Sequence, residues 1–589
     1  MTLGRERTDA RLQLGLGMRE GLLYALLPMA IAFAMRVKEL PEVLAGGLTN
    51  PDSYMRLLRL EEGLRHHDVG YIVARDGSGA GTLLHWSHLL DALLLLLAAP
   101  FRLVMDTHAA LHAAAVVFGP LCMAALGVAL CWAISPLVER RWLWLTPVAA
   151  ALSAPIASYG LPGVVHHHVP LLVVSVMTCG YALRGALGLA RKGDGLAMGA
   201  WAGVGIWLSP ESMPFTLIAF GGLWFAWLLS PRSGLARMIG GTAAGFFVVV
   251  TATFAVDPPY AGYGSVEIDR LSVVYVGLAV ALACAACGAM LIERAKQWRM
   301  TAGVAVPALC IVAWLASFPA VIRGPDGLMS AHDTQAMLGI ITEMLPVHGI
   351  AEAIEFLLTG SIAALTLAWF SVSRRSLLLA YAALCACVLV ALGAMHVRFA
   401  AYPSALAAAM LPLLVARFSA SMADWPESSQ ALARVGLMAA FVLLPCGAAF
   451  SQAKAATSAA APSCSLDDSA SLLAGHADQI VLANPGGSPE LLYRTHVLTV
   501  GSLYHRNVAA FMRLRAAWRS GPSDAVPAAM HATGASLVLF CPSPARSMLV
   551  ADLPPDTLLD RLNQGHVPPW LRKLSEDPRS GNVLYEVMP

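Results

Sequence analysis

The chain has 589 residues, of which 57% are hydrophobic and 13% are charged, against roughly 25% charged residues in an ordinary soluble domain. This composition excludes a soluble protein and indicates a membrane protein. The formal net charge is +2 and the basic residues are spread through many loops, so we expect no nucleic-acid partner.

Thirteen apolar segments follow one another along the chain, each close to the roughly 20 residues that a helix needs to cross a bilayer. They predict thirteen transmembrane helices, near residues 18–36, 107–134, 142–158, 169–189, 196–208, 213–229, 239–256, 271–292, 302–320, 354–371, 377–395, 399–416 and 435–452. The sequence therefore predicts a polytopic α-helical membrane protein whose transmembrane domain covers residues 1–453.

The basic residues of the loops indicate the orientation in the membrane. With a cytoplasmic N-terminus, the cytoplasmic loops are VERR (138–141), ARKGDG (190–195), PRSGLAR (231–237), ERAKQWR (293–299), SRR (373–375) and 417–434. Each contains Lys or Arg, as is typical of short cytoplasmic loops. We therefore expect a multi-pass protein of a bacterial inner membrane with its N-terminus in the cytoplasm.

Two long loops fall on the opposite, periplasmic side, at about 37–106 and 321–353. The first contains a helical stretch, DSYMRLLRLEEGLRHH, and ends in an apolar run that is short for a span. We expect that run to lie along the membrane interface or to re-enter the membrane. The second loop has no obvious regular structure, and such long loops are usually functional or disordered.

The C-terminal region is polar. An Ala/Ser linker (454–463) leads to residues 464–589, where the strand-like runs QIVLAN, HVLTVG, SLVLFC and VLYEV alternate with helical stretches. This pattern predicts a small α/β domain, and an odd number of spans places it in the periplasm. The region contains Cys464 and Cys541, which either form a disulfide in an oxidising compartment or remain free and buried.

Two polar clusters of the first long loop could carry chemistry. Asp52 is either the N-cap of the helical stretch or a functional carboxylate, and Arg56, four residues on, is placed to pair with it on one helix face. The cluster HWSHLLD (85–91), which contains His85, is either an interfacial anchor through its Trp or the polar lining of a site.

Three consecutive histidines, His166, His167 and His168, stand at the periplasmic end of the fourth predicted span. Because three adjacent side chains cannot share one helix face, we expect at most two of them to serve one site. Imidazole suits transition metals, but this spacing is poor for a structural zinc site and the sequence contains no HExxH motif. Hydrogen bonding to a phosphate or a sugar hydroxyl is favoured.

Three further charged residues lie at the same side of the membrane. Glu211 stands in a short turn between apolar helices, Glu343 lies in the second long loop, and Arg398 opens the twelfth predicted span. A carboxylate at the membrane rim is costly unless it is paired, which indicates a functional site. Arg398 could bind a phosphate bidentately, or its side chain could snorkel to the headgroups.

Several activities are not supported by the sequence. It contains no P-loop, no GxSxG elbow, no kinase motif set and no Rossmann fingerprint before a helix. Charged residues near the middle of the predicted spans are nearly absent, which argues against an ion-coupled transporter.

The order of the segments and five motifs resemble the C-type membrane glycosyltransferase (GT-C) superfamily, most closely the catalytic subunit of oligosaccharyltransferase. The motifs are PDSYMR (51–56), HWSHLLD (85–91), HHH (166–168), TEMLP (342–346) and RFAAYP (398–403). The resemblance covers most of the chain at the level of layout. It implies a GT-C fold with a soluble C-terminal domain.

The resemblance also implies roles for the residues above. Asp52 would be catalytic, as the general base or as a ligand of a metal that serves the acceptor, and Glu343 would help to hold the acceptor or the metal. Donors in this superfamily are sugars on polyprenyl phosphate or pyrophosphate. The residues expected to bind the donor phosphate and sugar are Arg56, His85, His167, His168, Glu211 and Arg398.

A divalent cation, Mg²⁺ or Mn²⁺, would be held by Asp52, His166 and Glu343. The oligosaccharyltransferase pattern has an acidic pair beside the fourth span, where this chain has its three histidines. A metal-independent site is therefore the alternative.

The soluble region lacks the Trp-Trp-Asp motif that reads an asparagine sequon in this family, so asparagine glycosylation is not expected. Instead, Tyr504, His505 and Arg506 follow a predicted strand, where they either contact the acceptor or another part of the substrate or start a helix. The sequence thus predicts an inverting sugar transfer to a periplasmic glycolipid or polysaccharide acceptor, in contact with membrane lipids. The alternatives are a glycan ligase or polymerase, and a flippase or transporter for lipid-linked sugars.

Overall fold

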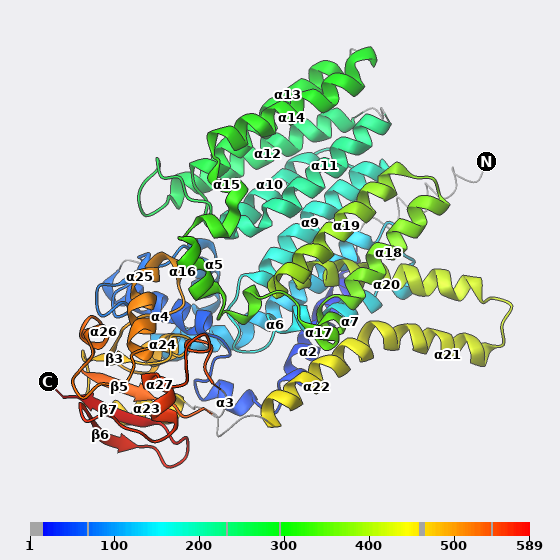
Figure 1. Cartoon of the computed structure of the whole chain (residues 1–589). Coiled ribbons are helices and arrows are strands. Elements are labelled where there is room, and N and C mark those ends of the chain that lie inside the picture. Colours follow the sequence, from blue (N-terminus) through cyan, green and yellow to red (C-terminus); the bar gives the residue numbers. More distant parts are fainter. Residues whose placement is uncertain are drawn as a thin grey trace.

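The computed structural model describes residues 16–67, 70–230, 234–293, 296–458, 466–543 and 546–588. Long helices run side by side in a bundle, and a small domain built on a sheet lies at one end of it (Figure 1). We call this end of the bundle the domain end. The C-terminus lies in the small domain.

Ten helices of the described residues are long and apolar enough to cross a membrane. They are α2 (Met18–Met35), α6 (Thr107–Ile134), α9 (His168–Leu187), α11 (Met213–Leu229, preceded by the 3₁₀ turn η3, Pro210–Ser212), α12 (Leu235–Val256), α13 (Val273–Ile292), α14 (Arg299–Ser317), α19 (Leu377–Met395), α20 (Ala401–Ser421, preceded by η7, Val397–Ala400) and the last span, Glu427–Ser451, which comprises α21 (Glu427–Met438) and most of α22 (Leu444–Ser458). An eleventh is present if α17 (Gly349–Phe356) and α18 (Leu358–Ser373), which are bent by 61°, count as one span. A multi-pass helical membrane domain agrees with the prediction.

The predicted count of thirteen differs from this result at three segments. Residues 354–371 form the bent pair. Residues 142–158 divide into α7 (Leu145–Leu152) and α8 (Ala154–Ala157), because Ser153 is extended and Pro155 restarts the helix. Residues 196–208 lie in α10 (Asp194–Leu208), whose 15 residues span only about 22 Å at ~1.5 Å per residue.

Helix α10 is held closely against α12 by small residues. Gly195, Gly199 and Gly203 recur every four residues on α10 and face α12. A Cβ built at Gly199 would lie only 2.0 Å from the carbonyl oxygen of Thr242, and one at Gly195 would lie 2.6 Å from that of Met238. The glycine spacing therefore lets the two backbones touch, as in other closely packed membrane helices.

Replacing Gly199 with Leu is expected to separate α10 from α12 and to cost about 1–3 kcal/mol or more of folding free energy, because backbone atoms cannot move aside as a side chain can. The thermal midpoint of the protein in detergent measures the loss. The same replacement at Gly436, where an added Cβ meets nothing within 4 Å, is the matched control and should leave the midpoint almost unchanged. Equal midpoints for both variants would contradict the close helix contact.

The first long loop folds against the domain end. It contains α3 (Leu40–Leu44), α4 (Pro51–His66), the two-stranded antiparallel ribbon β1 (Ile72–Val73) and β2 (Thr82–Leu83), α5 (His88–Ala98) and η1 (Phe101–Leu103). The predicted helical stretch is confirmed as α4. Asn50 is its N-cap, since its side chain accepts a hydrogen bond from the Ser53 amide, and Pro51 occupies the first turn.

The second long loop consists of short helices rather than irregular chain. These are α15 (Ala320–Arg323), η5 (Gly324–Gly327), α16 (Ala331–Leu338) and η6 (Thr342–Met344), followed by α17. Helix α16 packs against the C-terminal domain through Ala336 and Met337, which belong to the core cluster of that domain.

The C-terminal domain is built on a five-stranded mixed sheet with the strand order β4-β3-β5-β7-β6. The strands are β3 (Ile480–Leu482), β4 (Leu498–Thr499), β5 (Leu537–Phe540), β6 (Leu571–Glu576) and β7 (Val583–Val587), and the helices are α23 (Leu466–Leu472), α24 (Ser488–Arg494), α25 (Val508–Trp518), α26 (Ala528–His531) and α27 (Leu558–Asn563), with η9 (His505–Asn507). Strands β3, β4 and β5 are parallel, whereas β7 pairs antiparallel with β5 and β6.

Four of these strands coincide with the predicted strand-like runs. Strand β6 was not predicted, because it is a charged edge strand with little apolar alternation. Residues 454–458 of the predicted linker continue α22, and residues 459–465 lie outside the described part. Cys541 is disulfide-bonded, whereas Cys464 lies outside the described residues.

Buried polar contacts fasten the C-terminal domain to the first long loop. Asp76 is fully buried and accepts hydrogen bonds from the hydroxyls of Thr82, Thr499 and Ser502. Arg75 donates to the carbonyl oxygens of Thr495 and Leu492 at 2.6 and 2.7 Å. These bonds hold the domain against the segment between β1 and β2.

Candidate functional site

Asp52 lies in the first turn of α4, where its side chain points away from the helix backbone. One carboxylate oxygen, Oδ1, accepts a hydrogen bond from the Tyr504 hydroxyl at 3.0 Å. The other, Oδ2, lies 3.1 Å from His166 Nε2. Burial alone would raise the pKa of Asp52, but the contacts with His166 and Tyr504 hold that pKa below its usual range. Asp52 is therefore an ionised carboxylate fixed on both oxygens, and Asn50 rather than Asp52 caps the helix.

Arg56 does not pair with Asp52, contrary to the interpretation of their spacing. Its NH1 lies 3.0 Å from Asp91 Oδ1 on α5, and Arg59 pairs with the other oxygen of Asp91. All three side chains are buried, so packing of α4 against α5 decides this pairing. Asp52 is therefore paired with His166 and Tyr504 instead of Arg56.

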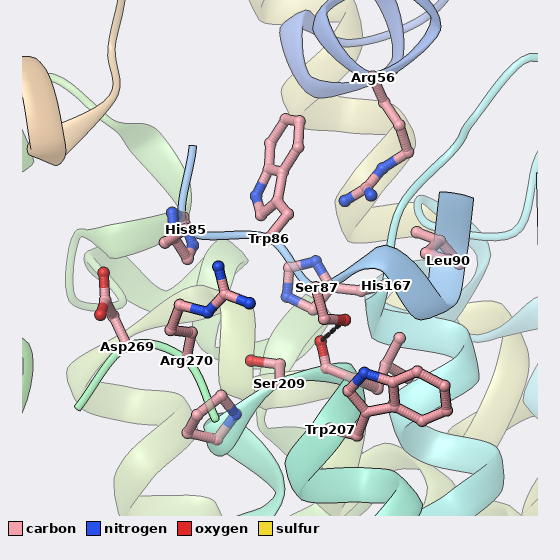
Figure 2. Close-up of a pocket in the computed structure, with 12 residues that line it drawn as sticks. Arg56, His85, Trp86, Ser87, Leu90, His167, Trp207, Ser209, Asp269 and Arg270 are labelled. Atoms are coloured by element: carbon pink, nitrogen blue, oxygen red, sulfur yellow. Dashed lines mark hydrogen bonds between the residues drawn. The ribbon is translucent and has the colours of Figure 1, made fainter. Parts of the chain in front are cut away.

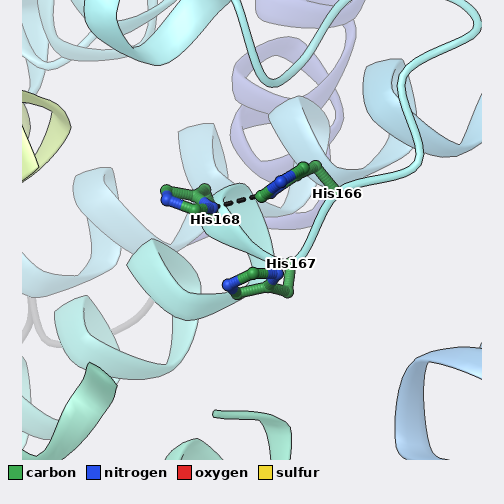
Figure 3. A group of neighbouring side chains, drawn as sticks. All are labelled: His166, His167 and His168. Carbon is green, nitrogen blue, oxygen red and sulfur yellow. Dashed lines mark hydrogen bonds between the residues drawn. The ribbon is translucent and has the colours of Figure 1, made fainter. Parts of the chain in front are cut away.

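The three histidines lie together in one cluster (Figure 3). His166 Nδ1 and His168 Nδ1 are 2.6 Å apart, and the ring centroids of the three pairs are separated by 4.4–4.6 Å. The assumption that all three lie on one helix was wrong, because only His168 lies in α9 and His166 and His167 precede it. Burial and the neighbouring His166 lower the pKa of His167, which keeps its ring neutral at pH 7.

Glu211, Arg398 and Glu343 come together beside the histidines. Arg398 NH2 lies 2.5 Å from Glu211 Oε1, and Arg398 NH1 lies 3.6 Å from Glu343 Oε1. The Tyr159 hydroxyl donates to Glu343 Oε2 at 2.9 Å, and the Tyr159 ring stacks on His168 with centroids 4.2 Å apart. Arg398 is thus a partly buried cation shared by two carboxylates, at the point where η3, η6 and η7 meet.

The donor set of this cluster fits a divalent cation. Three buried polar atoms have no hydrogen-bond partner among the described residues, namely His167 Nε2, His168 Nε2 and Glu211 Oε2. His167 Nε2 and Glu211 Oε2 face each other at 3.7 Å, and one nitrogen from each of the three histidines lies within 4.8 Å of the others. Unsatisfied buried imidazole and carboxylate atoms at such separations are suitable ligands for a metal ion.

A cavity adjoins the cluster through His167 (Figure 2). Its empty volume, counted with its open mouth, is about 340 Å³. The lining residues are Arg56, His85, Trp86, Ser87, Leu90, His167, Trp207, Leu208, Ser209, Pro210, Asp269 and Arg270.

Two arginines reach this cavity from different walls. Figure 2 shows the Arg270 guanidinium between His85, Trp86 and His167, with Arg56 approaching from α4. Arg270 NH2 is paired with Asp257 Oδ1 at 2.9 Å, but Arg270 Nε and NH1 and Arg56 Nε are buried and have no partner among the described residues. The cavity therefore presents unused N–H donors on cationic groups, which suit an anionic ligand.

The predicted acceptor residues of the C-terminal domain separate into two groups. Tyr504 reaches Asp52, whereas His505 and Arg506 in η9 contact Asp269 instead, with His505 Nε2 2.7 Å from Asp269 Oδ2. The Tyr504 ring also packs edge-on against Trp86. The segment begins a short helix, as one of the two interpretations expected, and contact with the acceptor stays a prediction.

Four site residues were missed in the sequence, namely Tyr159, Trp207, Asp269 and Arg270. The last two lie in the polar segment 257–272 between α12 and α13, and an adjacent acid and base in a segment between two membrane spans was a usable signal. No signal in the sequence pointed to Tyr159 or Trp207, because aromatic residues are common near the ends of membrane spans.

Comparisons with known proteins give matches only at the level of structure. No protein-family model matches the chain. No curated protein sequence matches it either.

The similar structures include those of the oligosaccharyltransferase of Archaeoglobus fulgidus. One, AglB in complex with an inhibitory peptide and a dolichol-phosphate, has a TM-score of 0.62 at 11% identity, over 88% of this chain and 69% of that chain. A second, in complex with Zn and sulfate, has a TM-score of 0.62 at 12% identity over 96% and 74% of the two chains. A third, tethered to an acceptor peptide containing the NVT sequon, has a TM-score of 0.62 at 13% identity over 88% and 69%.

These similarities extend over both the membrane helices and the C-terminal domain. They confirm the fold that the five motifs and the order of the segments indicated. The chain has the GT-C fold of archaeal oligosaccharyltransferase.

Proposed function

We propose that the protein is a membrane glycosyltransferase that transfers a sugar from a polyprenyl-phosphate or pyrophosphate donor to a glycolipid or glycan acceptor. The observation that carries the proposal is the ionised Asp52, fixed by His166 and Tyr504, beside a cavity with unused cationic donors. The fold supports it, since one neighbour of this fold was solved with a dolichol-phosphate.

The reaction is a single displacement with inversion at the anomeric carbon. The acceptor hydroxyl bonds to the anomeric carbon while the bond from that carbon to the phosphate oxygen breaks, and the leaving phosphate keeps the electron pair. Asp52 accepts the hydroxyl proton, because a carboxylate oxygen that holds one hydrogen bond retains a second lone pair.

Negative charge grows on the departing phosphate, so cationic and N–H groups there lower the barrier. Arg398 supplies a guanidinium next to the histidine cluster, and Arg270, Arg56 and His85 line the adjoining cavity. We therefore assign the donor phosphate and sugar to the space between Arg398, His167 and the cavity, and the acceptor to the side of Asp52 next to Tyr504.

A divalent cation, when bound, would act as a Lewis acid on phosphate or hydroxyl oxygens. His166, His167, Asp52 and Glu211 are the residues that would hold it, and their imidazole nitrogens favour Mn²⁺ or Zn²⁺ over Mg²⁺. Glu343 serves chiefly to hold Tyr159 and Arg398.

The lipid character of the donor explains the location of the site. A polyprenyl tail belongs in the bilayer and its phosphate at the surface, and the cluster lies where η3, η7 and α9 begin their spans. With the basic loops in the cytoplasm, the domain end faces the periplasm of a bacterial inner membrane. A flippase or transporter needs a central polar pathway, whereas the charged and imidazole groups of this site, among the described residues, gather at one end of the bundle.

The acceptor is proposed to be a lipid or a glycan rather than an asparagine sequon. The neighbour with a tethered acceptor peptide binds an NVT sequon, but this chain has no Trp-Trp-Asp motif in its C-terminal domain.

Mass spectrometry of glycolipids and envelope polysaccharides, with and without the gene, tests the proposed function. One glycan is expected to lose a sugar in the deletion strain and to regain it when the wild-type gene is returned. Accumulation of the lipid-linked sugar in the cytoplasmic leaflet of the deletion strain, rather than in the periplasmic leaflet, would overturn the proposal in favour of a flippase.

A further inference from the structure

A second group of metal-ligating side chains lies outside the Asp52 cluster. His85 comes from the first long loop, Asp269 from the segment between α12 and α13, and His505 from η9 of the C-terminal domain. One ligand atom from each lies within 4.8 Å of the other two. His505 Nε2 is 2.7 Å from Asp269 Oδ2, and the rings of His85 and His505 are 4.7 Å apart.

These three side chains are placed suitably to bind a metal. All three are only partly exposed, and the Asp269 side chain is only 8% exposed. Contacts with His505 and Arg506 fix the Asp269 carboxyl oxygens beside the two imidazoles.

The Arg506 guanidinium orients Asp269 for metal binding and does not take the place of the metal ion. Its guanidinium bonds both oxygens of Asp269, at 2.8 and 2.6 Å, and also pairs with Glu267. Ligating carboxylates are usually hydrogen-bonded in this way by a second residue. The charge of Arg506 is balanced by Glu267, so the negative charge of Asp269 remains to attract a dication.

We propose that His85, Asp269 and His505 bind a divalent transition-metal ion of the zinc class, separate from the Asp52 cluster, which joins the C-terminal domain to the membrane domain. Two imidazoles and one carboxylate are a ligand set that suits Zn²⁺. His85 and Asp269 also line the cavity, so the remaining coordination position of the ion faces that cavity. Binding of this ion does not depend on the proposed transferase activity.

The test measures zinc in the full-length protein, purified in detergent, stripped with a chelator and dialysed against Zn²⁺. To remove the histidine cluster from the count, His166 and His168 are both replaced by Ala. This background is expected to retain one equivalent of zinc by elemental mass spectrometry. Adding His505→Ala or Asp269→Asn should lower the zinc content more than tenfold, whereas adding His332→Ala, an exposed histidine beside Asp333, should not change it.

Two results would overturn the proposal. One is a folded background protein that binds no zinc, which would leave His505 and Asp269 as a simple ion pair between domains. The other is a zinc content unaffected by His505→Ala and Asp269→Asn.

If these variants do not fold, the background protein with His166 and His168 replaced by Ala decides the matter. Zn²⁺ should raise its midpoint of thermal unfolding, and Mg²⁺ should not. No shift with Zn²⁺ would overturn the proposal. Loss of transferase activity alone, with zinc binding intact, would count against the proposed function and not against this site.

Discussion

Replacing Asp52 with Asn is expected to reduce sugar transfer by about 10²–10⁴-fold, the range that a general base contributes. Asn has the size of Asp but cannot accept the acceptor proton. Its carbonyl oxygen can still accept the Tyr504 hydrogen bond, and its amide can donate to His166 in the other tautomer, so the fold should be retained. The rate of product formation in the complemented deletion strain, or in proteoliposomes, measures the effect.

The control for Asp52→Asn is the same change at Asp333, which bonds Ser330 at the start of α16 and lies apart from the cluster. Asp333→Asn should leave transfer within about twofold of the wild-type rate, because it changes only an exposed contact with Ser330. Wild-type transfer by Asp52→Asn, with equal amounts of protein in the membrane, would refute the role of Asp52 as the base.

Replacing Asp91 with Asn is expected to destabilise the protein by about 3–5 kcal/mol, the cost of breaking a buried ion pair. Asp91 is the carboxylate partner of both Arg56 and Arg59, and the side chains of all three are at most 3% exposed. Without Asp91, two guanidinium groups would stay buried between α4 and α5 with no anion. The thermal midpoint in detergent, or protease resistance in membranes, measures the loss.

The chain offers a matched control for Asp91. Asp552 in the C-terminal domain also bonds two arginines, Arg515 and Arg519, but its side chain is 59% exposed. Asp552→Asn should cost no more than about 1 kcal/mol, because solvent screens surface ion pairs. Equal losses for the two variants would show that burial does not set the strength of the Asp91 network.

The ion pairs of Asp91 also affect activity. Arg56 lines the cavity and orients α4, on which Asp52 stands. Asp91→Asn is therefore expected to reduce transfer through misplacement of α4 even at temperatures where the protein remains folded.

Much of the site could be predicted from residue types. Asp52, the three histidines, Glu211, Glu343 and Arg398 were each singled out, and they lie in one cluster with Tyr504. Their common property is that a charged or imidazole side chain beside an apolar span is costly without a partner. The partners themselves could not be predicted, because Tyr504 and Asp52 are separated by 452 positions in the chain.

Two interpretations of the sequence were wrong because they considered only neighbouring residues in the chain. Arg56 was expected to pair with Asp52 by helical spacing, but α5 brings Asp91 closer. The three histidines were assumed to lie on one helix, but α9 begins only at His168. In both cases a local rule was applied where a contact between segments decides the geometry.

The amino-acid sequence by itself determined the membrane architecture, most of the spans, the α/β C-terminal domain and the residue types of the site. These depend on apolar length, periodicity and charge, which each segment carries within itself. Only the tertiary structure decided which side chains pair, that Arg270 and Asp269 line the cavity, and that the C-terminal domain contributes Tyr504 and His505. Such contacts depend on how distant helices pack, and no short stretch of sequence contains that information.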